Sequence, residues 1–200
     1  MMREYTVHIV DDDQDLRAAI EELFRASGYL TIGYASAEEF LTASINSGIN
    51  CLILDIRMSG MSGMQMLDEL NRRGSYIPVI FLTGHGSVPT AIKAIRNGAF
   101  DFLEKPIDNQ VLLDKVEMAL QTSAERQKQL EILNTMTNRE VEIMHLLAKG
   151  NSNKTISGML GLSTSTVNFH RMNIKRKTKA NSVSDFVRLS NVAPPPQLKG

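Results

Sequence analysis

The sequence predicts an α/β domain with a doubly wound, five-stranded parallel sheet, followed by an all-α domain of four helices. Over residues 1–122, five short apolar runs alternate strictly with stretches of helical periodicity, which is typical of βαβ units around a parallel sheet. Residues 135–192 contain capped helical stretches instead, with a glycine-containing turn between the second and the third. Two short helices joined by such a turn indicate a helix-turn-helix motif.

The distribution of charge supports a division into two domains. The chain of 200 residues has 22 basic and 22 acidic residues and therefore no net charge. Residues 1–135 hold 12 Lys and Arg against 19 Asp and Glu, a net charge of −7, whereas residues 136–200 hold 10 against 3, a net charge of +7. The basic second part is expected to face a polyanion.

Composition excludes several other classes of protein. The single cysteine, Cys51, rules out a disulfide framework and a Cys-based zinc site. No apolar run approaches the ~18 residues of a membrane span. A predicted strand follows Met1 almost directly, so we expect no signal peptide. The expectation is a cytoplasmic protein without a membrane partner.

The elements of the first domain follow from periodicity and capping signals. Its strands are expected at residues 5–10, 29–34, 51–54, 78–82 and 101–103. Apolar residues at positions 16, 19, 20, 23 and 24 predict the first helix, which Ser27-Gly28 ends. The second helix begins at Ser36 as N-cap, with Glu39 completing a capping box. The third spans about residues 64–72, the fourth has Ala91, Ile92 and Ile95 on one face, and the last begins near residue 109.

Polar side chains stand at the ends of four of these strands. Asp11 and Asp12 end the first strand, Asp55 the third, Thr83 the fourth, and Lys105 follows the fifth. In an open α/β sheet, the ligand crevice lies at the carboxyl ends of the strands, so we expect these five residues to converge. Each also has a plain structural explanation: turn caps for Asp55 and Thr83, a solvated loop for the acidic run, and an ordinary surface position for Lys105.

Together the five residues have a coherent chemistry. Carboxylates that share a crevice repel one another and favour a hard divalent cation, Mg²⁺ or Mn²⁺, which binds one or two carboxylates together with waters and phosphate oxygens. An aspartate beside such an ion can attack phosphorus and form an aspartyl phosphate. Thr83 can donate a hydrogen bond to a phosphoryl oxygen, and Lys105 supplies a positive charge. Asp55 is the expected phosphoryl acceptor.

Four segments resemble the receiver domain of two-component response regulators, over about residues 4–122. They are Val-Asp-Asp-Asp at residues 10–13, Leu-Asp-Ile-Arg-Met-Ser-Gly-Met-Ser-Gly at 54–63, Leu-Thr-Gly-His-Gly at 82–86 and Asp-Phe-Leu-Glu-Lys-Pro at 101–106. The resemblance implies a flavodoxin-like fold. It also implies that Asp55 is phosphorylated and that the metal ion is held by Asp11, Asp12, Asp55 and the backbone carbonyl of Arg57.

The same resemblance implies how the phosphoryl group is sensed. Thr83 would be the switch hydroxyl, Phe102 the switch aromatic residue and Lys105 the phosphate-sensing lysine, with a cis peptide bond before Pro106. Two residues of the fourth helix, Ile92 and Arg96, would contact a second copy of the chain. One departure from the family is visible, because Ser59 stands where a proline is usual.

The second domain is expected over residues 135–192. Residues 123–134 are charged, rich in glutamine and free of proline and glycine, so they form either a helical linker or a flexible tether. The first helix of the domain spans residues 137–148, with Thr137 and Glu140 as a capping box. Further helices are expected at residues 153–160 and 164–178, and a fourth opens at Ser182 with Val183, Phe186, Val187 and Leu189 packed inward. The proline-rich residues 193–200 are expected to form a disordered tail.

The third helix of this domain carries side chains that are suited to reading DNA. Arg pairs with guanine and Asn with adenine in the major groove, whereas Lys, Ser and Thr suit phosphates. The alternative is a solvated basic face. The expected DNA contacts are Asn153, Lys154, Thr164, Ser165, Thr166, Asn168, His170, Arg171, Lys175 and Lys179.

Residues 137–144, 150–157 and 160–171 resemble the four-helix effector domain of LuxR-type regulators, and the chain to about residue 192 resembles response regulators of the FixJ/NarL type. The family tends to have an acidic residue at the place of Asn168 and Leu-Gly at the place of Thr178-Lys179. The resemblance implies a phosphorylation-dependent regulator of transcription. A partner histidine kinase would phosphorylate it, and the phosphorylated homodimer would bind promoter DNA and activate transcription with RNA polymerase.

Two other functions are open on the residues alone. A phosphohydrolase that uses Asp55 as nucleophile typically needs an Asp two residues later as general acid, and that position holds Arg57. An architectural DNA-binding protein that is indifferent to phosphate would leave the crevice residues unexplained. Apart from turnover of its own phosphoryl group, we therefore expect no enzymatic activity.

Overall fold

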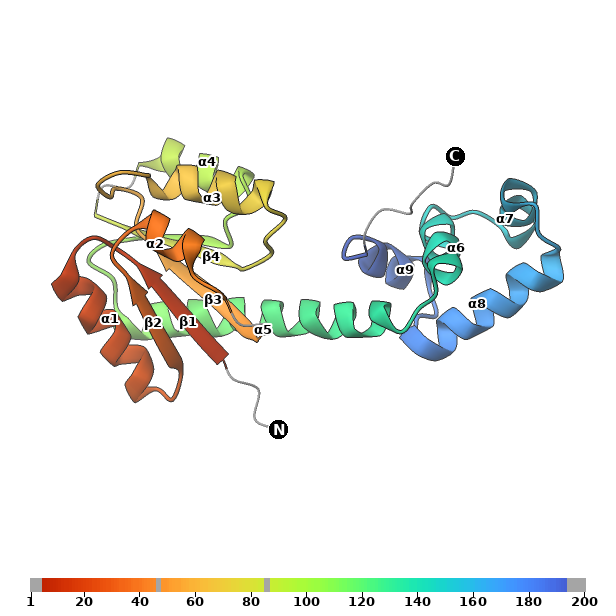
Figure 1. Cartoon of the computed structure of the whole chain (residues 1–200), viewed down its shortest axis with the longest axis horizontal. Helices are drawn as coiled ribbons and strands as arrows, with labels where there is room; N and C mark the ends of the chain where they lie inside the picture. Colours follow the sequence, from red (N-terminus) through yellow and green to blue (C-terminus); the bar gives the residue numbers. More distant parts are fainter. Residues whose placement is uncertain (1–4, 46–47, 85–86, 194–200) are drawn as a thin grey trace. The chain divides into compact units, whose positions relative to one another are not determined.

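The chain divides into two compact units, Met1–Ala124 and Glu125–Gly200. The computed structural model describes residues 5–45, 48–84 and 87–193. The predicted tail, except Ala193, lies outside these residues, as do positions 85–86 of the third receiver-like segment and the first four residues. Figure 1 shows the helices and strands of both units. Each unit has its own hydrophobic core.

The first unit is a five-stranded, entirely parallel sheet in the order β2-β1-β3-β4-β5. This confirms the predicted doubly wound α/β fold. The strands are β1 (Tyr5–Val10), β2 (Leu30–Tyr34), β3 (Ile49–Leu54), β4 (Val79–Thr83) and β5 (Asp101–Glu104). The helices are α1 (Gln14–Ala26), α2 (Ala37–Thr42), α3 (Gly63–Arg72), α4 (Val88–Arg96) and α5 (Asn109–Asn134).

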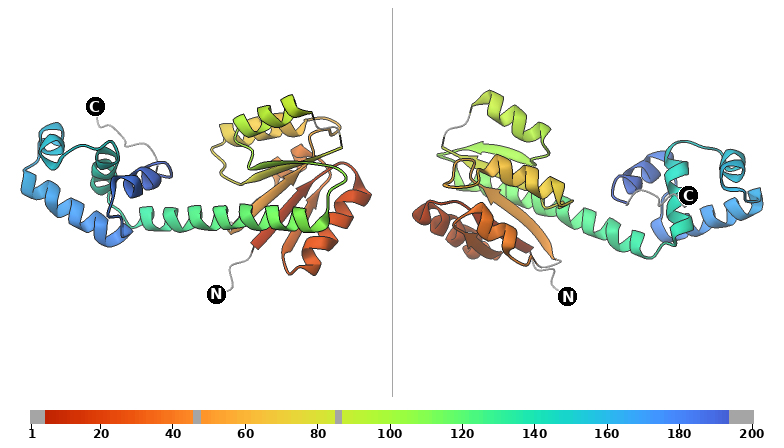
Figure 2. Two further views of the ribbon diagram at one scale, coloured as in Figure 1. Left: turned by 180° about the vertical axis from the view of Figure 1, so that it is seen from behind. Right: turned by 45° about the horizontal axis from the view of Figure 1, so that its top comes forward.

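Helices cover both faces of the sheet (Figure 2). Helices α2, α3 and α4 pack on one face through residues such as Phe40, Met66 and Ala94, and α1 and α5 pack on the other through Phe24 and Val116. All six residues of β3 are buried, because this strand lies in the middle of the sheet with helices on both sides. It begins two residues earlier than predicted, since its first residues pair with the start of β1.

One local expectation for this unit is corrected by the structure. At the start of α2, Ser36 accepts the Glu39 amide as predicted, but the Glu39 carboxylate accepts the amide of Ala35 at 2.7 Å, so the pair is not a capping box.

The apolar face of α4 is open to solvent. Ile92 and Ile95 are each 47% exposed, and Ala94 is the buried residue of α4.

A buried polar cluster lies in the first unit, under α2. His8 on β1 is 2% exposed, and its Nε2 lies 3.0 Å from Asn50 Oδ1. The Asn50 amide nitrogen donates to the Gly48 carbonyl, so Oδ1 accepts the Nε2 proton and Nδ1 is left to accept from the Tyr34 hydroxyl at 3.2 Å. The Phe40 ring closes the cluster edge-on to the imidazole. Burial lowers the pKa of His8, and the bond to Asn50 partly offsets this effect.

The stability of the first unit is therefore expected to fall as the pH is lowered from 8 to 5. Because the folded pKa of His8 is below its unfolded value of 6.5, the unfolded state takes up the proton first. Full stability is present above pH 6.5 and is lost as the pH falls towards the folded pKa. Urea unfolding of His8→Phe should lack this component, while His145→Phe should retain it. Identical pH profiles for wild type and His8→Phe would contradict the prediction.

The second unit is all-α, as predicted. Its helices are α6 (Asn138–Ala148), α7 (Asn153–Leu160), α8 (Thr164–Thr178) and α9 (Val183–Ser190). Leu133, near the end of α5, belongs to the core of this unit. Because α5 runs to Asn134, the segment expected as a helical linker or a flexible tether is helical. Thr137 and Glu140 form the predicted capping box. Phe186 and Leu189 are buried in α9, but Val183 and Val187 are 53% and 40% exposed, which corrects the expectation that all four pack inward.

Nowhere among the described residues does the structure contain a helix with the length and apolar character that crossing a bilayer requires.

Candidate functional site

Three carboxylates meet at the carboxyl edge of the sheet. Asp11 and Asp12 follow β1 and Asp55 follows β3, and these strands are direct neighbours. One oxygen from each carboxylate lies within 4.8 Å of the others. Asp11 and Asp55 are 3% and 8% exposed, whereas Asp12 is open to solvent. The structure therefore brings together the three carboxylates that the sequence predicts to converge.

Lys105, which follows β5, reaches into this cluster. Its Nζ lies 2.8 Å from Asp11 Oδ2 and 3.6 Å from Asp55 Oδ1. Its backbone amide donates to the Thr83 carbonyl at 2.9 Å, which fixes the lysine next to the end of β4. The Lys105-Pro106 peptide bond is cis, as expected. One ammonium group thus contacts two carboxylates from different strands.

The cluster is electrostatically crowded. Burial raises the pKa of Asp55, and the Asp11 and Asp12 carboxylates raise it further. The Lys105 ammonium and the Ile56 amide, which donates to Asp55 Oδ1 at 2.9 Å, lower the pKa but do not restore its usual value. Three carboxylates beside one ammonium group leave an excess of negative charge, so the donor set fits a divalent cation with oxygen ligands.

Thr83 and Phe102, the expected switch residues, come from β4 and β5. Thr83 ends β4 and is 1% exposed. Phe102 is half-buried and pairs with Phe81 in the β4–β5 register, with 6.4 Å between the ring centroids. Arg57, whose carbonyl is an expected metal ligand, lies in the exposed loop after Asp55.

The loop after Asp55 is held by contacts that the sequence argument missed. The Ser59 amide donates to Asp12 Oδ2 at 2.9 Å, a bond that the usual proline at this position could not make. A Cβ atom on Gly63 would overlap the Asp55 carbonyl oxygen, so only glycine allows α3 to begin this close to the acceptor. The sequence pattern that indicates this arrangement is the capping box of Ser62 and Gln65, because it places Gly63 at the first position of α3.

The second unit contains the predicted helix-turn-helix. Gly161 ends α7 in the left-handed conformation, with φ of 62°, and Ser163 caps α8 by accepting the Thr166 amide. Val167 and Ile174 of α8 are fully buried, which fixes the face that α8 presents to the core.

The structure places most of the expected DNA contacts on the surface of α7 and α8, but three of them bind one another. Arg171 donates to Asn153 Oδ1 at 2.9 Å, and the Asn153 amide in turn donates to Asn168. These three side chains join α7 to α8. The others are exposed or half-buried: Lys154, Thr164, Ser165, Thr166, His170, Lys175 and Lys179.

Comparison with known protein families identifies both units. Residues 7–117 match the family model described as the response regulator receiver domain, and residues 134–190 match the model of bacterial regulatory proteins of the luxR family. The chain belongs to the response regulators. It is a transcriptional regulator of a two-component system, with a receiver domain and a LuxR-type DNA-binding domain.

Full-length response regulators are similar along nearly the whole chain. The transcriptional regulatory protein FixJ of Azorhizobium caulinodans is 38% identical over 96% of this chain and 95% of its own. Nodulation protein W of Bradyrhizobium diazoefficiens is 37% identical over 92% of this chain and 84% of its own. Among solved structures, the response regulator StyR is 35% identical with a TM-score of 0.60, covering 94% of this chain and 98% of its own. Full-length FixJ from B. japonicum is 32% identical with a TM-score of 0.55, covering 94% of this chain and 96% of its own.

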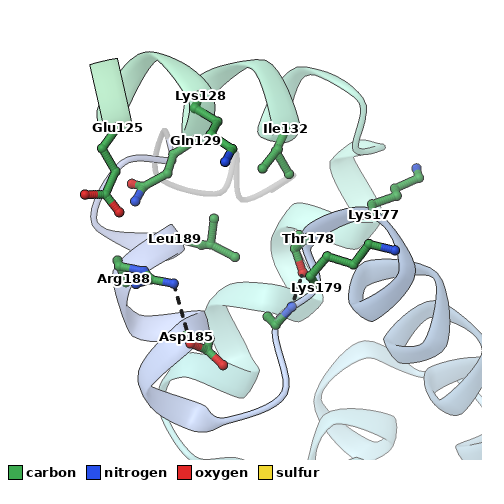
Figure 3. A pocket seen from close by; sticks show the side chains of 11 residues that line it. Glu125, Lys128, Gln129, Ile132, Lys177, Thr178, Lys179, Asp185, Arg188 and Leu189 are labelled. Atoms are coloured by element: carbon green, nitrogen blue, oxygen red, sulfur yellow. Dashed lines mark hydrogen bonds and ion pairs between the residues drawn. The ribbon is translucent and has the colours of Figure 1, made fainter. Parts of the chain in front are cut away.

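This response regulator also has a hollow of about 280 Å³ in its second unit (Figure 3). The hollow lies among the end of α5, the end of α8 and α9. Its charged groups have both signs, and Arg188 and Asp185 are paired at 3.5 Å. Four basic and two acidic residues line the hollow. Its lining residues are Glu125, Lys128, Gln129, Ile132, Lys177, Thr178, Lys179, Ala180, Asp185, Arg188 and Leu189.

Lys179 at this hollow carries backbone strain. It caps α8 with φ of 60°, in the left-handed region that glycine adopts freely. Lys179→Gly is expected to stabilise the response regulator by about 0.5–1 kcal/mol, because the relief of strain exceeds the added entropy of the unfolded chain. Lys179→Ala keeps the strained Cβ and should leave stability unchanged. Urea unfolding measures both, and equal midpoints for the Gly and Ala variants would contradict this account.

Proposed function

We propose that Asp55 is the residue that a partner histidine kinase phosphorylates, and that this reaction controls DNA binding. The observation that carries the proposal is the contact of Lys105 Nζ with both Asp11 and Asp55 within the three-carboxylate cluster. Such a cluster holds an acceptor oxygen, a set of metal ligands and a fixed positive charge within a few ångströms. These are the groups that phosphoryl transfer to a carboxylate requires.

Asp11, Asp12, Asp55 and the backbone carbonyl of Arg57 are proposed to hold Mg²⁺ or Mn²⁺. The bound cation would neutralise the excess carboxylate charge and the charge of the incoming phosphoryl group. The bond between Lys105 and Asp11 would orient that carboxylate towards the site. The bond from the Ser59 amide would do the same for Asp12.

In the proposed transfer, an Asp55 carboxylate oxygen forms a bond to phosphorus while the phosphorus–nitrogen bond of the kinase phosphohistidine breaks. Lys105 would pair with the new phosphoryl oxygens, and the Thr83 hydroxyl would donate a hydrogen bond to one of them. The half-buried Phe102 would follow Thr83 inward, because it lies on the neighbouring strand. The regulator would later lose the group by hydrolysis, returning Asp55 and inorganic phosphate.

The output is proposed to be a homodimer that binds promoter DNA in the cytoplasm and activates transcription together with RNA polymerase. We assign the receiver to residues 1–122, the helical linker to 123–134, the DNA-binding domain to 135–192 and a tail to 193–200. Support for a dimer surface comes from α4, where Val88, Ile92 and Ile95 are 74%, 47% and 47% exposed. Phosphate-dependent movement of Thr83 and Phe102 would alter the adjoining β5 edge of this surface.

Selection of genomic DNA fragments tests the proposal. The purified full chain is incubated with fragments, with and without Mg²⁺ plus beryllofluoride, a mimic of the aspartyl phosphate. We expect fragments that are enriched only with the mimic, and no enrichment when EDTA removes the cation. The same fragments enriched in every condition would leave DNA binding in place and remove phosphorylation as its control.

The dimer surface is tested by Ile92→Glu and Arg96→Glu. With the mimic bound, sedimentation of the wild type should show a dimer, whereas Ile92→Glu should weaken association at least about tenfold, because a charge would be buried in an apolar contact. Tyr76→Glu replaces another exposed apolar residue, 62% exposed, outside α4 and should dimerise normally. A wild type that stays monomeric with the mimic would refute the dimer proposal.

A further inference from the structure

Two large apolar side chains on α8 are exposed to solvent and are not among the expected DNA contacts. Phe169 is 61% exposed and Met172 is 70% exposed. Single exposed apolar residues are common on protein surfaces. These two lie three residues apart, on successive turns of the second helix of a helix-turn-helix, and therefore form one continuous apolar patch.

The patch lies at the middle of the face that α8 turns away from its own core. Because an α-helix turns about 100° per residue, Ser165, Phe169, Met172 and Arg176, spaced by four, three and four residues, form one stripe. Val167 and Ile174 are fully buried and form the opposite stripe. The Phe169 ring also packs edge-on against the His170 ring, with 5.8 Å between the centroids, which limits its orientations.

Positive and polar groups surround this apolar patch. Arg176 and Lys179 are exposed and Lys175 is half-buried at one end, and Ser165 and Asn168 are exposed at the other. Residues 136–200 as a whole carry a net charge of +7. A basic surface with an apolar centre fits a polyanion that presents apolar groups at its recognition edge. In duplex DNA that group is the C5 methyl of thymine, which lies in the major groove.

We propose that Phe169 and Met172 read thymine methyl groups in the major groove and so determine part of the sequence specificity. The inference rests on the proposed function, because it requires α8 to lie in the groove of promoter DNA. Phe169 and Met172 would contact methyl groups of successive base pairs, while Arg176 and Lys179 pair with phosphates or base edges. Each subunit of the proposed homodimer would bind one half of the DNA site (a half-site). The surface would thus favour thymine at particular positions of each half-site.

Replacement of thymidine by deoxyuridine tests this directly, because it removes only the methyl group. The full chain, with Mg²⁺ and beryllofluoride, is titrated against a fragment from the selection above in which one thymidine at a time is replaced. Fluorescence anisotropy should show binding about fourfold weaker at one or two positions per half-site, the change that loss of one buried methyl group produces. Replacements elsewhere should have no effect.

Phe169→Ala and Met172→Ala should bind the unmodified fragment more weakly and should no longer respond to deoxyuridine at the position that each side chain reads. Met159→Ala is the matched control, because Met159 is 60% exposed on α7 and should leave the methyl effect intact. Thermal unfolding of the three variants should match the wild type, since all three side chains are largely exposed.

Three results would overturn the inference. Wild-type binding that is unchanged by every deoxyuridine replacement would refute methyl reading and leave DNA binding in place. A methyl effect that persists in both Phe169→Ala and Met172→Ala would assign it to other residues. If these variants lose self-association without DNA and keep the methyl effect, the patch contacts a second copy of the chain. Selection of no fragment in any condition would instead refute the proposed function itself.

Discussion

Asp55→Asn is expected to abolish phosphoryl acceptance. With acetyl phosphate and Mg²⁺ as donor system, incorporation of phosphate should fall below about 1% of the wild-type level, because the amide lacks the nucleophilic carboxylate oxygen. Phosphate-affinity gel electrophoresis measures the modified fraction. Asp68→Asn, an exposed carboxylate on α3 outside the crevice, should be phosphorylated normally. Wild-type levels of acid-stable phosphate on Asp55→Asn would place the acceptor elsewhere.

The same variant should fold at least as well as the wild type. The pKa of Asp55 in the folded receiver is raised above its unfolded value of 3.8, with burial as the largest cause. The folded state therefore binds the proton more tightly, and at neutral pH the ionised carboxylate lowers stability. A neutral Asn removes this cost. Unchanged or improved urea unfolding would show that the lost phosphorylation does not result from misfolding.

Glu140→Ala is expected to destabilise the DNA-binding domain by about 2–3 kcal/mol. Glu140 is 3% exposed, and its Oε2 accepts from Lys177 Nζ at 2.7 Å and from the Thr137 amide at 2.8 Å. Breaking a buried pair costs about 3–5 kcal/mol, and the value is lower here because the Lys177 side chain is 23% exposed and can reach water. The expected fall in the urea midpoint is about 1–2 M.

Glu142→Ala provides the matched control on the same helix. Its carboxylate pairs with Arg139 at 2.6 Å, but both side chains are about one-third exposed, at 30% and 34%, so the expected loss is below about 1 kcal/mol. Equal destabilisation by the two variants would refute the special role of Glu140. Burial raises the pKa of Glu140, but Lys177 and Thr137 lower it more, so that its pKa is below the usual 4.5. The added stability is present above pH 4.5 and is lost as the pH falls towards the folded pKa.

The Glu140–Lys177 pair also shows a limit of the sequence argument. Position 177 belongs to a run of basic residues at the end of α8, and the sequence alone does not separate it from the neighbours expected at DNA. In the structure its ammonium binds Glu140 and the Thr135 carbonyl, at 2.7 and 2.8 Å. Arg171, Asn153 and Asn168 likewise bind one another. Whether a basic or amide side chain of α7 or α8 binds a neighbouring side chain or faces solvent thus depends on distances between helices. No local sequence pattern contains those distances.

The sequence by itself determined the order of the strands and helices along the chain, the caps at Thr137 and Ser163, and the convergence of Asp11, Asp12, Asp55, Thr83 and Lys105. This was possible because strand ends in a parallel sheet share one edge and because capping depends on neighbouring residues. Only the tertiary structure decided that the apolar face of α4 is open, that the Ser59 amide binds Asp12 and that Phe169 and Met172 are exposed. Each of these depends on how segments far apart in the sequence pack, and hydrophobic periodicity does not show which apolar face finds a partner within the chain.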